Sequence, residues 1–308
     1  MALTFGTAKN AEVLRRLDLT ITRRLDGMLQ GDYRGLVPGH GSELGETRGY
    51  QPGDDVRRID WNVTARTQNV HVRESIADRE LETWALVDLS PSLDFGTANY
   101  TKRELALIGL SAVGFITART GNRLGAVIAG SAGPATVIPA RGGRAHLMAV
   151  LHRALMRPKE TEPGGTTDLG SAIARLAALH QRRGLAVVIS DFLAPPGWDH
   201  ALRRLSTRHE TLAIEVVDPR ELELPAVGVL ALVDPETGRR REVQTSSAKL
   251  RARYAAAAAD QRAEIAASIR GAGADHLQLR TDRDWVTDLV RFVALRRERA
   301  ARLPRKGR

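Results

Sequence analysis

Three oxygen-bearing side chains occur at alternate positions where a short apolar run ends. Residues 83–87 form the run, and Asp88, Ser90 and Ser92 follow it. In a parallel α/β sheet, the loops beyond the carboxyl ends of the strands form the binding crevice, so an acid and two hydroxyls there can converge on one point. Carboxylate and hydroxyl oxygens suit Mg²⁺ or Mn²⁺ better than zinc or copper. The spacing therefore predicts a divalent-metal site after this strand.

Two later segments could complete the same site. Residues 164–173 contain a glycine pair followed by Thr166 and Thr167, at the predicted start of a helix. The apolar run at residues 185–189 leads to a second acid, Asp191. The simpler alternative is that the first acid and its serines only cap a turn and bind no ion.

From residue 82 onward, short apolar runs alternate with helical patterns. This alternation predicts an α/β fold with a doubly wound, mainly parallel sheet, whose strands and helices would position the three loops. The predicted strands are residues 83–87, 124–129, 185–189, 212–217 and 276–279. The predicted helices are residues 102–119, 144–156, 169–181, 200–207 and 246–269, with a last one from about residue 284.

The chain divides into three predicted parts. Residues 1–81 hold an amphipathic helix followed by a loop-rich segment full of glycine and charge, and residues 82–295 form the α/β domain. Within that domain, a small β excursion is expected near residues 225–245, where two β-prone runs flank a turn-forming sequence. Residues 296–308 form a basic tail.

Composition narrows the chemistry and the partners. No cysteine occurs among the 308 residues, which excludes disulfides, thiolate zinc sites and cysteine nucleophiles. The net charge is +10, and the tail contributes much of it with six Arg and one Lys against one Glu. Such runs are usually solvated ends, and aromatic residues do not interleave with the basic ones, so nucleic acid is an unlikely partner.

The compartment is expected to be the cytoplasm. Residues 1–10 lack the apolar stretch of a cleaved signal peptide. The longest nearly apolar stretch, residues 105–118, is shorter than the ~20 residues that a membrane span requires. We therefore expect no transmembrane segment.

The three oxygen-rich loops together resemble the metal-ion-dependent adhesion site of the von Willebrand factor A-type fold, which combines an Asp-x-Ser-x-Ser loop, a Gly-x-Thr loop and a later strand-end Asp. The resemblance assigns Asp88, Ser90 and Ser92 to the first loop, Thr167 to the second and Asp191 to the third. Thr166 is the alternative ligand in the second loop. The resemblance implies a bound Mg²⁺ or Mn²⁺ with an open position that a partner's carboxylate can fill.

The N-terminal segment sharpens the resemblance. Residues 39–43 read Gly-His-Gly-Ser-Glu, residues 48–50 read Arg-Gly-Tyr, and residues 53–61 read Gly-Asp-Asp-Val-Arg-Arg-Ile-Asp-Trp. This pattern, upstream of the Asp-x-Ser-x-Ser loop, is similar to that of the bacterial "domain of unknown function 58" family. Members of that family are typically encoded beside MoxR-type AAA+ ATPases. The resemblance implies a chaperone-like, non-enzymatic role with such an ATPase and an unknown protein client.

The charged N-terminal block has a structural interpretation. Its opposite charges predict an ion-pair network that ties the segment to the α/β domain, with Trp61 as a core anchor. The members of the network are Glu43, Glu46, Asp54, Asp55 and Asp60 against Arg48, Arg57, Arg58 and Arg66.

An alternative function for the same strand-end site is that of a metal-dependent, phosphoesterase-like hydrolase, since Mg²⁺ beside an Asp and a hydroxyl can polarise a phosphoryl group. Aspartyl-phosphate enzymes, however, usually place a second acid two residues after the first, where this chain has Ser90. The binding interpretation is therefore the leading one.

Overall fold

The computed structural model describes residues 47–51, 56, 59–73, 81–131, 133–159 and 167–302. Residues 38–80 cluster into a small compact unit, separate from the large unit that contains residues 81–302. The predicted N-terminal helix, Thr166 and the end of the basic tail lie outside the described residues.

The large unit is built on a six-stranded sheet in the order β10-β7-β6-β3-β4-β5. Its strands are β3 (Glu82–Asp88), β4 (Arg123–Ala129), β5 (Thr136–Gly142), β6 (Leu185–Ser190), β7 (Glu210–Val217) and β10 (Asp275–Arg280). All pairings are parallel except that of β4 with β5. This arrangement confirms the predicted doubly wound, mainly parallel α/β fold. The edge strand β5 was not predicted, because it is half-exposed, carries Pro139 and lacks a buried apolar run.

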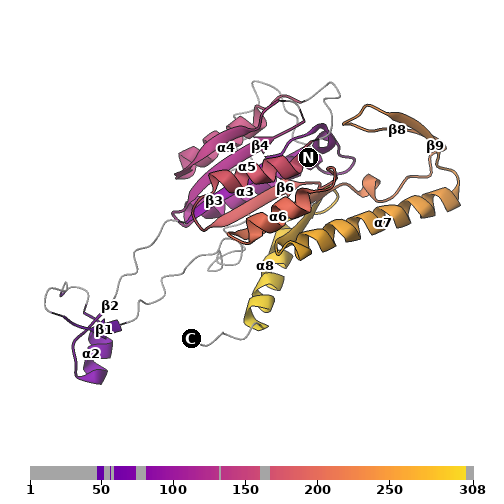
Figure 1. Ribbon diagram of the computed structural model, residues 1–308. Coiled ribbons are helices and arrows are strands. Elements are labelled where there is room, and N and C mark those ends of the chain that lie inside the picture. Colours follow the sequence, from indigo (N-terminus) through magenta and orange to yellow (C-terminus); the bar gives the residue numbers. More distant parts are fainter. Residues whose placement is uncertain are drawn as a thin grey trace. The chain divides into compact units, whose positions relative to one another are not determined.

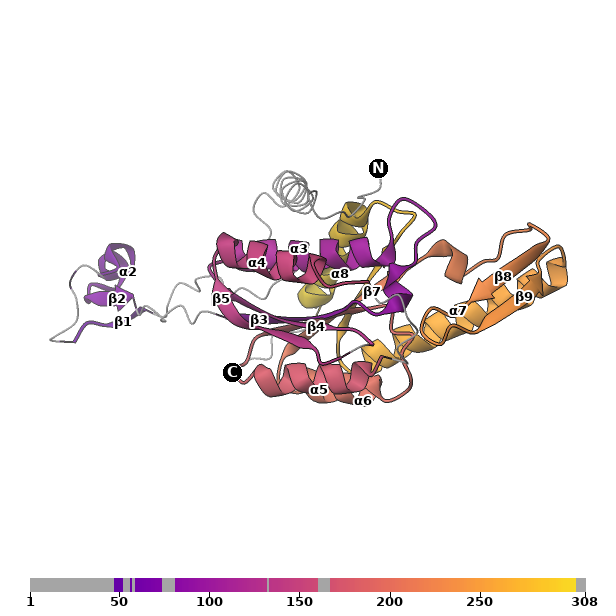
Figure 2. The same cartoon turned by 90° about the horizontal axis from the view of Figure 1, so that it is seen from above.

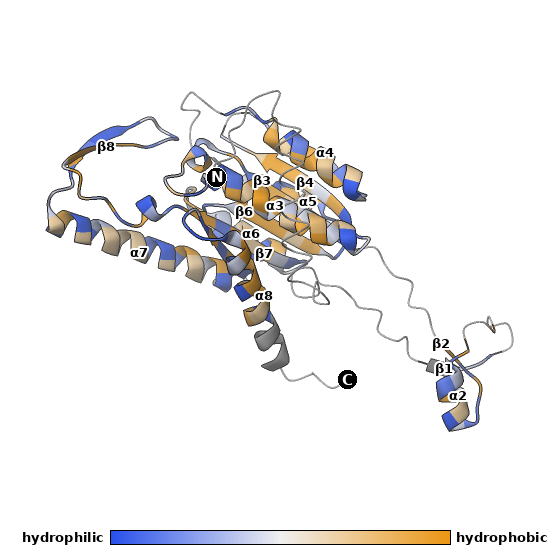
Figure 3. Cartoon of the chain, turned by 180° about the vertical axis from the view of Figure 1, so that it is seen from behind, coloured by the Kyte–Doolittle hydropathy of each residue, from blue (hydrophilic) through white to orange (hydrophobic). Residues whose placement is uncertain are grey.

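Helices cover both faces of this sheet (Figure 2). One face carries α3 (Lys102–Arg119), α4 (Arg144–Leu155) and α8 (Trp285–Arg302), and the other carries α5 (Leu169–Leu179), α6 (Trp198–Ser206) and α7 (Ala248–Gly271). Successive strand residues point to opposite faces, so Ala85 and Val87 join the first core while Trp84 and Leu86 join the second. Figure 3 shows the resulting apolar strands between the helical layers. The sheet is therefore buried on both sides, as parallel strands require.

Helix α8 continues past residue 295, where the basic tail was predicted to begin. The first residue of that predicted tail, Arg296, pairs with Glu210 and Asp275 at N···O distances of 2.9 Å each. These two carboxylates hold the side chain against the domain. None of the described helices is long and apolar enough to cross a membrane.

An antiparallel hairpin of β8 (Val229–Val233) and β9 (Arg240–Gln244) interrupts the α/β pattern where the excursion was expected. Its base adjoins the start of α7, and its turn points back towards the domain (Figure 1). Asp234 organises the turn, because its carboxylate accepts hydrogen bonds from the backbone N–H groups of Glu236 and Thr237. Gly238 adopts a φ of 69°, which closes the turn.

The small unit contains β1 (Thr47–Gly49) paired antiparallel with β2 (His71–Arg73), and the helix α2 (Trp61–Thr67). Within the small unit, the expectation that Trp61 anchors a core is wrong, because its side chain is 69% exposed there, at the first position of α2. Asp60 and Val72 are the buried residues among those described in this unit, and Asp60 caps the helix by accepting from the N–H groups of Asn62 and Val63. Most of the predicted ion-pair network lies outside the described residues.

Candidate metal centre

The topology places two of the predicted ligands at the reversal of the strand order. Strand β3 pairs with β4 on one side and with β6 on the other, so the chain winds outward in both directions from this point. Asp88 ends β3, and Asp191 follows the last residue of β6. In open α/β sheets, ligands bind beyond the carboxyl ends of the strands at such a reversal. The two acids therefore lie where the fold offers a binding crevice.

The first loop folds around the carboxylate of Asp88, which is 2% exposed. Its Oδ1 accepts a hydrogen bond from the backbone N–H of Ser90 at 3.0 Å, and its Oδ2 accepts one from Ser190 Oγ at 2.8 Å. Ser90 precedes a 3₁₀ turn, η3 (Pro91–Asp94), and its Oγ lies 3.1 Å from Ser92 Oγ. The alternate spacing thus brings an acid and two hydroxyls into one buried cluster.

The third loop turns sharply after β6. Asp191 is 2% exposed, and its Oδ1 accepts a hydrogen bond from the N–H of Leu193 at 3.1 Å. Phe192 has a φ of 56°, a conformation that is costly for a residue with a Cβ. Its N–H donates to Ser190 Oγ, and its ring packs 5.0 Å from that of Trp198. The packed ring holds the turn that presents Asp191.

The second loop places Thr167 two residues before the first residue of α5. Its side chain is 3% exposed, and its Oγ1 is buried without a hydrogen-bond partner among the described residues. Its backbone N–H donates to Glu236 Oε2 at 3.2 Å. Asp168 caps α5 by accepting from the N–H of Ser171 at 2.8 Å. Thr167 is therefore held at the helix start with a free hydroxyl.

The two acids Asp88 and Asp191 differ in whether a nearby cation compensates their negative charge. Burial, followed by the negative charge of Asp191, raises the pKa of Asp88 to about 6. Burial opposes ionisation of Asp191 as well, but the ammonium of Lys102 holds the pKa of Asp191 below its usual value. Lys102 Nζ lies 2.8 Å from Asp191 Oδ2 and also pairs with Glu221. Among the described residues, Asp88 forms no ion pair.

Sequence reasoning missed the cations beside the site. Lys102, the first residue of α3, is 1% exposed, and Arg262 of α7 donates to the backbone oxygen of Asp191 at 2.9 Å. Arg262 also pairs with Glu215 at 3.0 Å and with Glu221 at 2.9 Å. Glu221, the acid that these two cations share, lies in the charged Asp-Pro-Arg-Glu segment at residues 218–221. The charge of that segment is the sequence signal that could have indicated ion pairing beside the site.

The residues present fit a hard divalent cation. Two buried carboxylates and the hydroxyls of Ser90, Ser92 and Thr167 supply only oxygen donors, the set that Mg²⁺ and Mn²⁺ prefer. The partnerless Thr167 Oγ1 and the uncompensated charge of Asp88 are both groups that a cation would satisfy. Within the described part of the chain, no three His, Cys, Asp or Glu residues form a metal-holding cluster, so the hydroxyls would be needed.

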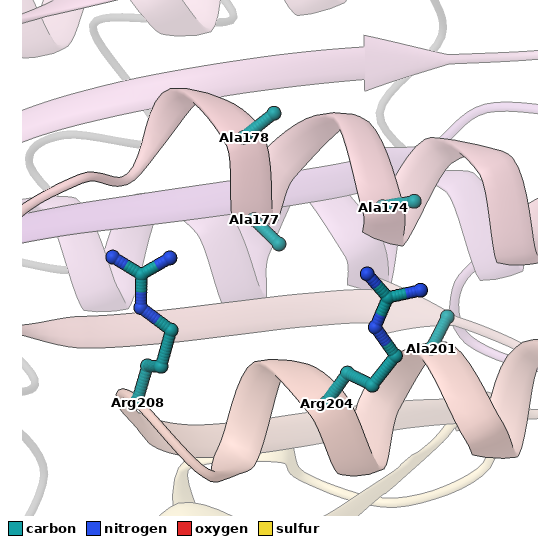
Figure 4. Close-up of a pocket in the computed structure, with 6 residues that line it drawn as sticks. All are labelled: Ala174, Ala177, Ala178, Ala201, Arg204 and Arg208. Carbon is teal, nitrogen blue, oxygen red and sulfur yellow. The ribbon is translucent and has the colours of Figure 1, made fainter.

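A pocket elsewhere in the domain contains none of these residues. It lies between α5 and α6 and is lined by Ala174, Ala177, Ala178, Ala201, Arg204 and Arg208 (Figure 4). Four of these side chains are methyl groups and the other two end in guanidinium groups. The lining offers no oxygen donors for a metal ion, so the strand-end cluster remains the candidate site.

Relatives from mycobacteria match between about half and almost the whole of the chain. An uncharacterized protein of Mycobacterium bovis and one of Mycobacterium tuberculosis are each 54% identical to it over 292 residues, covering 95% of this chain and 91% of theirs. An uncharacterized protein of Mycobacterium avium is 49% identical over 165 residues, covering 54% of this chain and 96% of its own length.

Solved structures are similar at a lower level. The crystal structure of the conserved hypothetical protein BatB from Bacteroides thetaiotaomicron is 15% identical with a TM-score of 0.42, covering 71% of this chain and 99% of that one. The VWA domain of SpRpn10 is 14% identical with a TM-score of 0.36, covering 69% and 94% of the two chains.

The family assignment rests on the sequence itself. A protein-family model described as "Protein of unknown function DUF58" matches residues 46–264. The match begins in the small unit and spans the strand-end loops of Asp88, Thr167 and Asp191, together with the β8–β9 hairpin. The chain therefore belongs to the DUF58 family of proteins of unknown function.

Proposed function

We propose that this protein is a non-enzymatic recognition module that holds a Mg²⁺ or Mn²⁺ ion at the ends of β3 and β6 and uses it to bind a carboxylate of another protein. The observation that carries the proposal is a buried, oxygen-only donor cluster in which one acid has no ion pair within the described residues and one hydroxyl has no hydrogen-bond partner there.

The chain's own residues have distinct roles in this proposal. Asp88, Ser90, Ser92 and Thr167 face the ion, and the Ser90 N–H and the Ser190 hydroxyl orient the Asp88 carboxylate. When bound, the ion supplies a positively charged coordination position for a partner's carboxylate. Asp191 shares its charge with Lys102, so we expect it to act on the ion more weakly than Asp88 does.

The partner class comes from the family resemblance rather than from the geometry. We propose a MoxR-type AAA+ ATPase and an unknown client as the interacting proteins, with a chaperone-like role in assembling or activating client complexes in the cytoplasm. In this proposal, the ATPase supplies mechanical work and the present chain supplies recognition through an acidic group at the metal centre.

The hydrolase alternative receives no specific support from the site. The residue two positions after Asp88 is Ser90, whose hydroxyl faces Ser92. Lys102, the nearby cation, is committed to Asp191 and Glu221. A binding role needs only the donor cluster and an approach for a carboxylate.

The test is capture of a purified MoxR-type AAA+ ATPase with wild-type, Asp88→Ala and Asp260→Ala proteins. Asp260→Ala is the matched control, because it removes an exposed carboxylate from α7. Each protein is assayed with Mg²⁺ and with EDTA, and circular dichroism checks folding. Mg²⁺-dependent capture by wild type and by the control, but not by Asp88→Ala, supports the proposal. Equal capture under all conditions contradicts it.

A further inference from the structure

The β8–β9 hairpin brings a carboxylate into contact with the second loop of the metal centre. Glu236 Oε2 accepts the backbone N–H of Thr167 at 3.2 Å, although the two residues are 69 positions apart in the sequence. Glu236 is half-buried, whereas Pro235 and Thr237 on either side of it are exposed. The hairpin turn therefore directs this one side chain towards the domain.

Hydrogen bonds at the turn and at the base of the hairpin fix the position of Glu236. At the turn, Asp234 accepts the N–H of Glu236 itself at 3.0 Å, which fixes the backbone that carries the side chain. At the base, Thr245 is fully buried, and its N–H and hydroxyl both donate to the Gly228 oxygen at 2.7 Å. Arg251 of α7 donates to the Thr245 oxygen at 2.6 Å. The position of Glu236 is thus built into the fold.

Glu236 lies against the second loop of the proposed centre without a cation of its own. Its side chain is half-buried, and its Oε2 lies 3.2 Å from the backbone N of Thr167, a member of the proposed ligand set. Within the described residues, Glu236 forms no ion pair. The hydroxyl of Thr167 is buried and has no hydrogen-bond partner among the described residues. A divalent cation between the hairpin and the strand ends would satisfy both groups.

We propose that Glu236 is an intramolecular ligand of the metal centre and occupies the side from which a partner's carboxylate approaches. The inference rests on the proposed function and adds a regulatory device to it. With the hairpin docked, the chain satisfies its own ion. A partner's carboxylate must displace Glu236, so recognition is coupled to movement of β8 and β9.

The test measures Mn²⁺ affinity by the electron paramagnetic resonance of the free ion, using full-length wild-type, Glu236→Gln, Glu242→Gln and Asp88→Asn proteins. Gln at position 236 keeps the acceptor for the Thr167 N–H but removes the charge. Glu242→Gln removes an exposed charge from β9 of the same hairpin and serves as the matched control. Because metal affinity depends on the number of charged ligands, we expect Glu236→Gln to bind Mn²⁺ at least about fivefold more weakly, with the control within twofold of wild type.

A second readout follows the hairpin directly. Hydrogen–deuterium exchange of the peptide covering residues 229–244 should slow when Mn²⁺ is added to wild type, and should not change in Glu236→Gln. Unchanged Mn²⁺ affinity in Glu236→Gln, with binding lost in Asp88→Asn, overturns the inference and leaves the proposed function standing. Tighter binding by Glu236→Gln also overturns it, because the hairpin would then obstruct the site. Absence of Mn²⁺ binding by wild type overturns both.

Discussion

Replacing Asp88 with Asn should stabilise the metal-free protein while removing its response to Mg²⁺. Burial and the neighbouring Asp191 raise the pKa of Asp88 from 3.8 to about 6. At pH 7.5 the carboxylate is ionised in both the native and the unfolded states, so this raised pKa is a cost to the native state of about 3 kcal/mol. Asn keeps an oxygen acceptor for the Ser90 N–H but disturbs the hydrogen bond from Ser190, which costs about 1 kcal/mol. The expected net gain is about 1–2 kcal/mol.

The assay is urea denaturation at pH 7.5 with EDTA and, separately, with saturating Mg²⁺. An ion that binds only the native state at 100 times its dissociation constant adds about 2.7 kcal/mol, so wild type should gain stability with Mg²⁺ and Asp88→Asn should not. Asp260→Asn, an exposed change on α7, should behave as wild type in both conditions. Destabilisation of metal-free Asp88→Asn, or a Mg²⁺ response equal to that of wild type, would refute the reasoning.

Three further changes test the charge balance and packing around the sheet. Lys102→Met leaves the buried carboxylate of Asp191 without its cation, whereas Glu221 keeps Arg262, so we expect the free energy of unfolding to fall by about 3–5 kcal/mol in urea denaturation. Gly125→Ala places a Cβ 2.6 Å from the ring carbons of Trp84, and we expect a loss of about 1–3 kcal/mol in the same assay. His180 stacks on His209 with ring centroids 3.9 Å apart, and burial, followed by the charge of His209, lowers the pKa of His180 to about 3. Between about pH 6.5 and 3 the unfolded chain binds a proton here that the native protein does not, so stability should fall by about 2 kcal/mol from pH 7 to pH 5, and His180→Phe should remove this component.

Each of these changes has a matched control or an opposing result. Lys249→Met removes an exposed cation from α7 and should alter stability by less than about 0.5 kcal/mol. Gly271→Ala adds a methyl group with no atom within 4 Å at the end of α7, and should be neutral or stabilising by up to about 1 kcal/mol. Equal losses in the matched pairs would contradict the roles given to Lys102 and Gly125. An unchanged pH dependence in His180→Phe would contradict the role given to that ring.

The central sheet could be predicted from sequence because its strands are buried on both faces. A continuous apolar run such as that of β6 has few alternative structures once helical patterns flank it. Strand β5 was not predicted, because a half-exposed edge strand has no continuous apolar run to detect. The burial of Trp61 was predicted wrongly for the converse reason. A large aromatic side chain favours burial on average, but at the first position of a short exposed helix it finds no core.

The predicted ligands of the candidate site lie where short local patterns mark them, after the ends of β3 and β6 and just before α5. Asp88, Ser90 and Ser92 are adjacent in sequence, so their spacing alone indicates a shared role. Lys102 and Glu236 reach the same place from a helix and from a hairpin turn, and only the tertiary structure brings them there. Their sequence neighbourhoods carry charge and turn signals that many solvated segments share.

The two strand-end acids are therefore not equivalent, and the difference explains how a folded protein can keep such a site. Asp191 is neutralised within the fold by Lys102, a buried pair whose geometry is fixed before any ligand arrives. Asp88 has no such partner among the described residues, and its charge is a cost that the rest of the domain must offset. If both acids were paired internally, a cation would gain little by binding. If neither were paired, two adjacent buried charges would threaten folding. One compensated acid and one uncompensated acid leave the protein stable enough to fold and the centre negative enough to attract an ion.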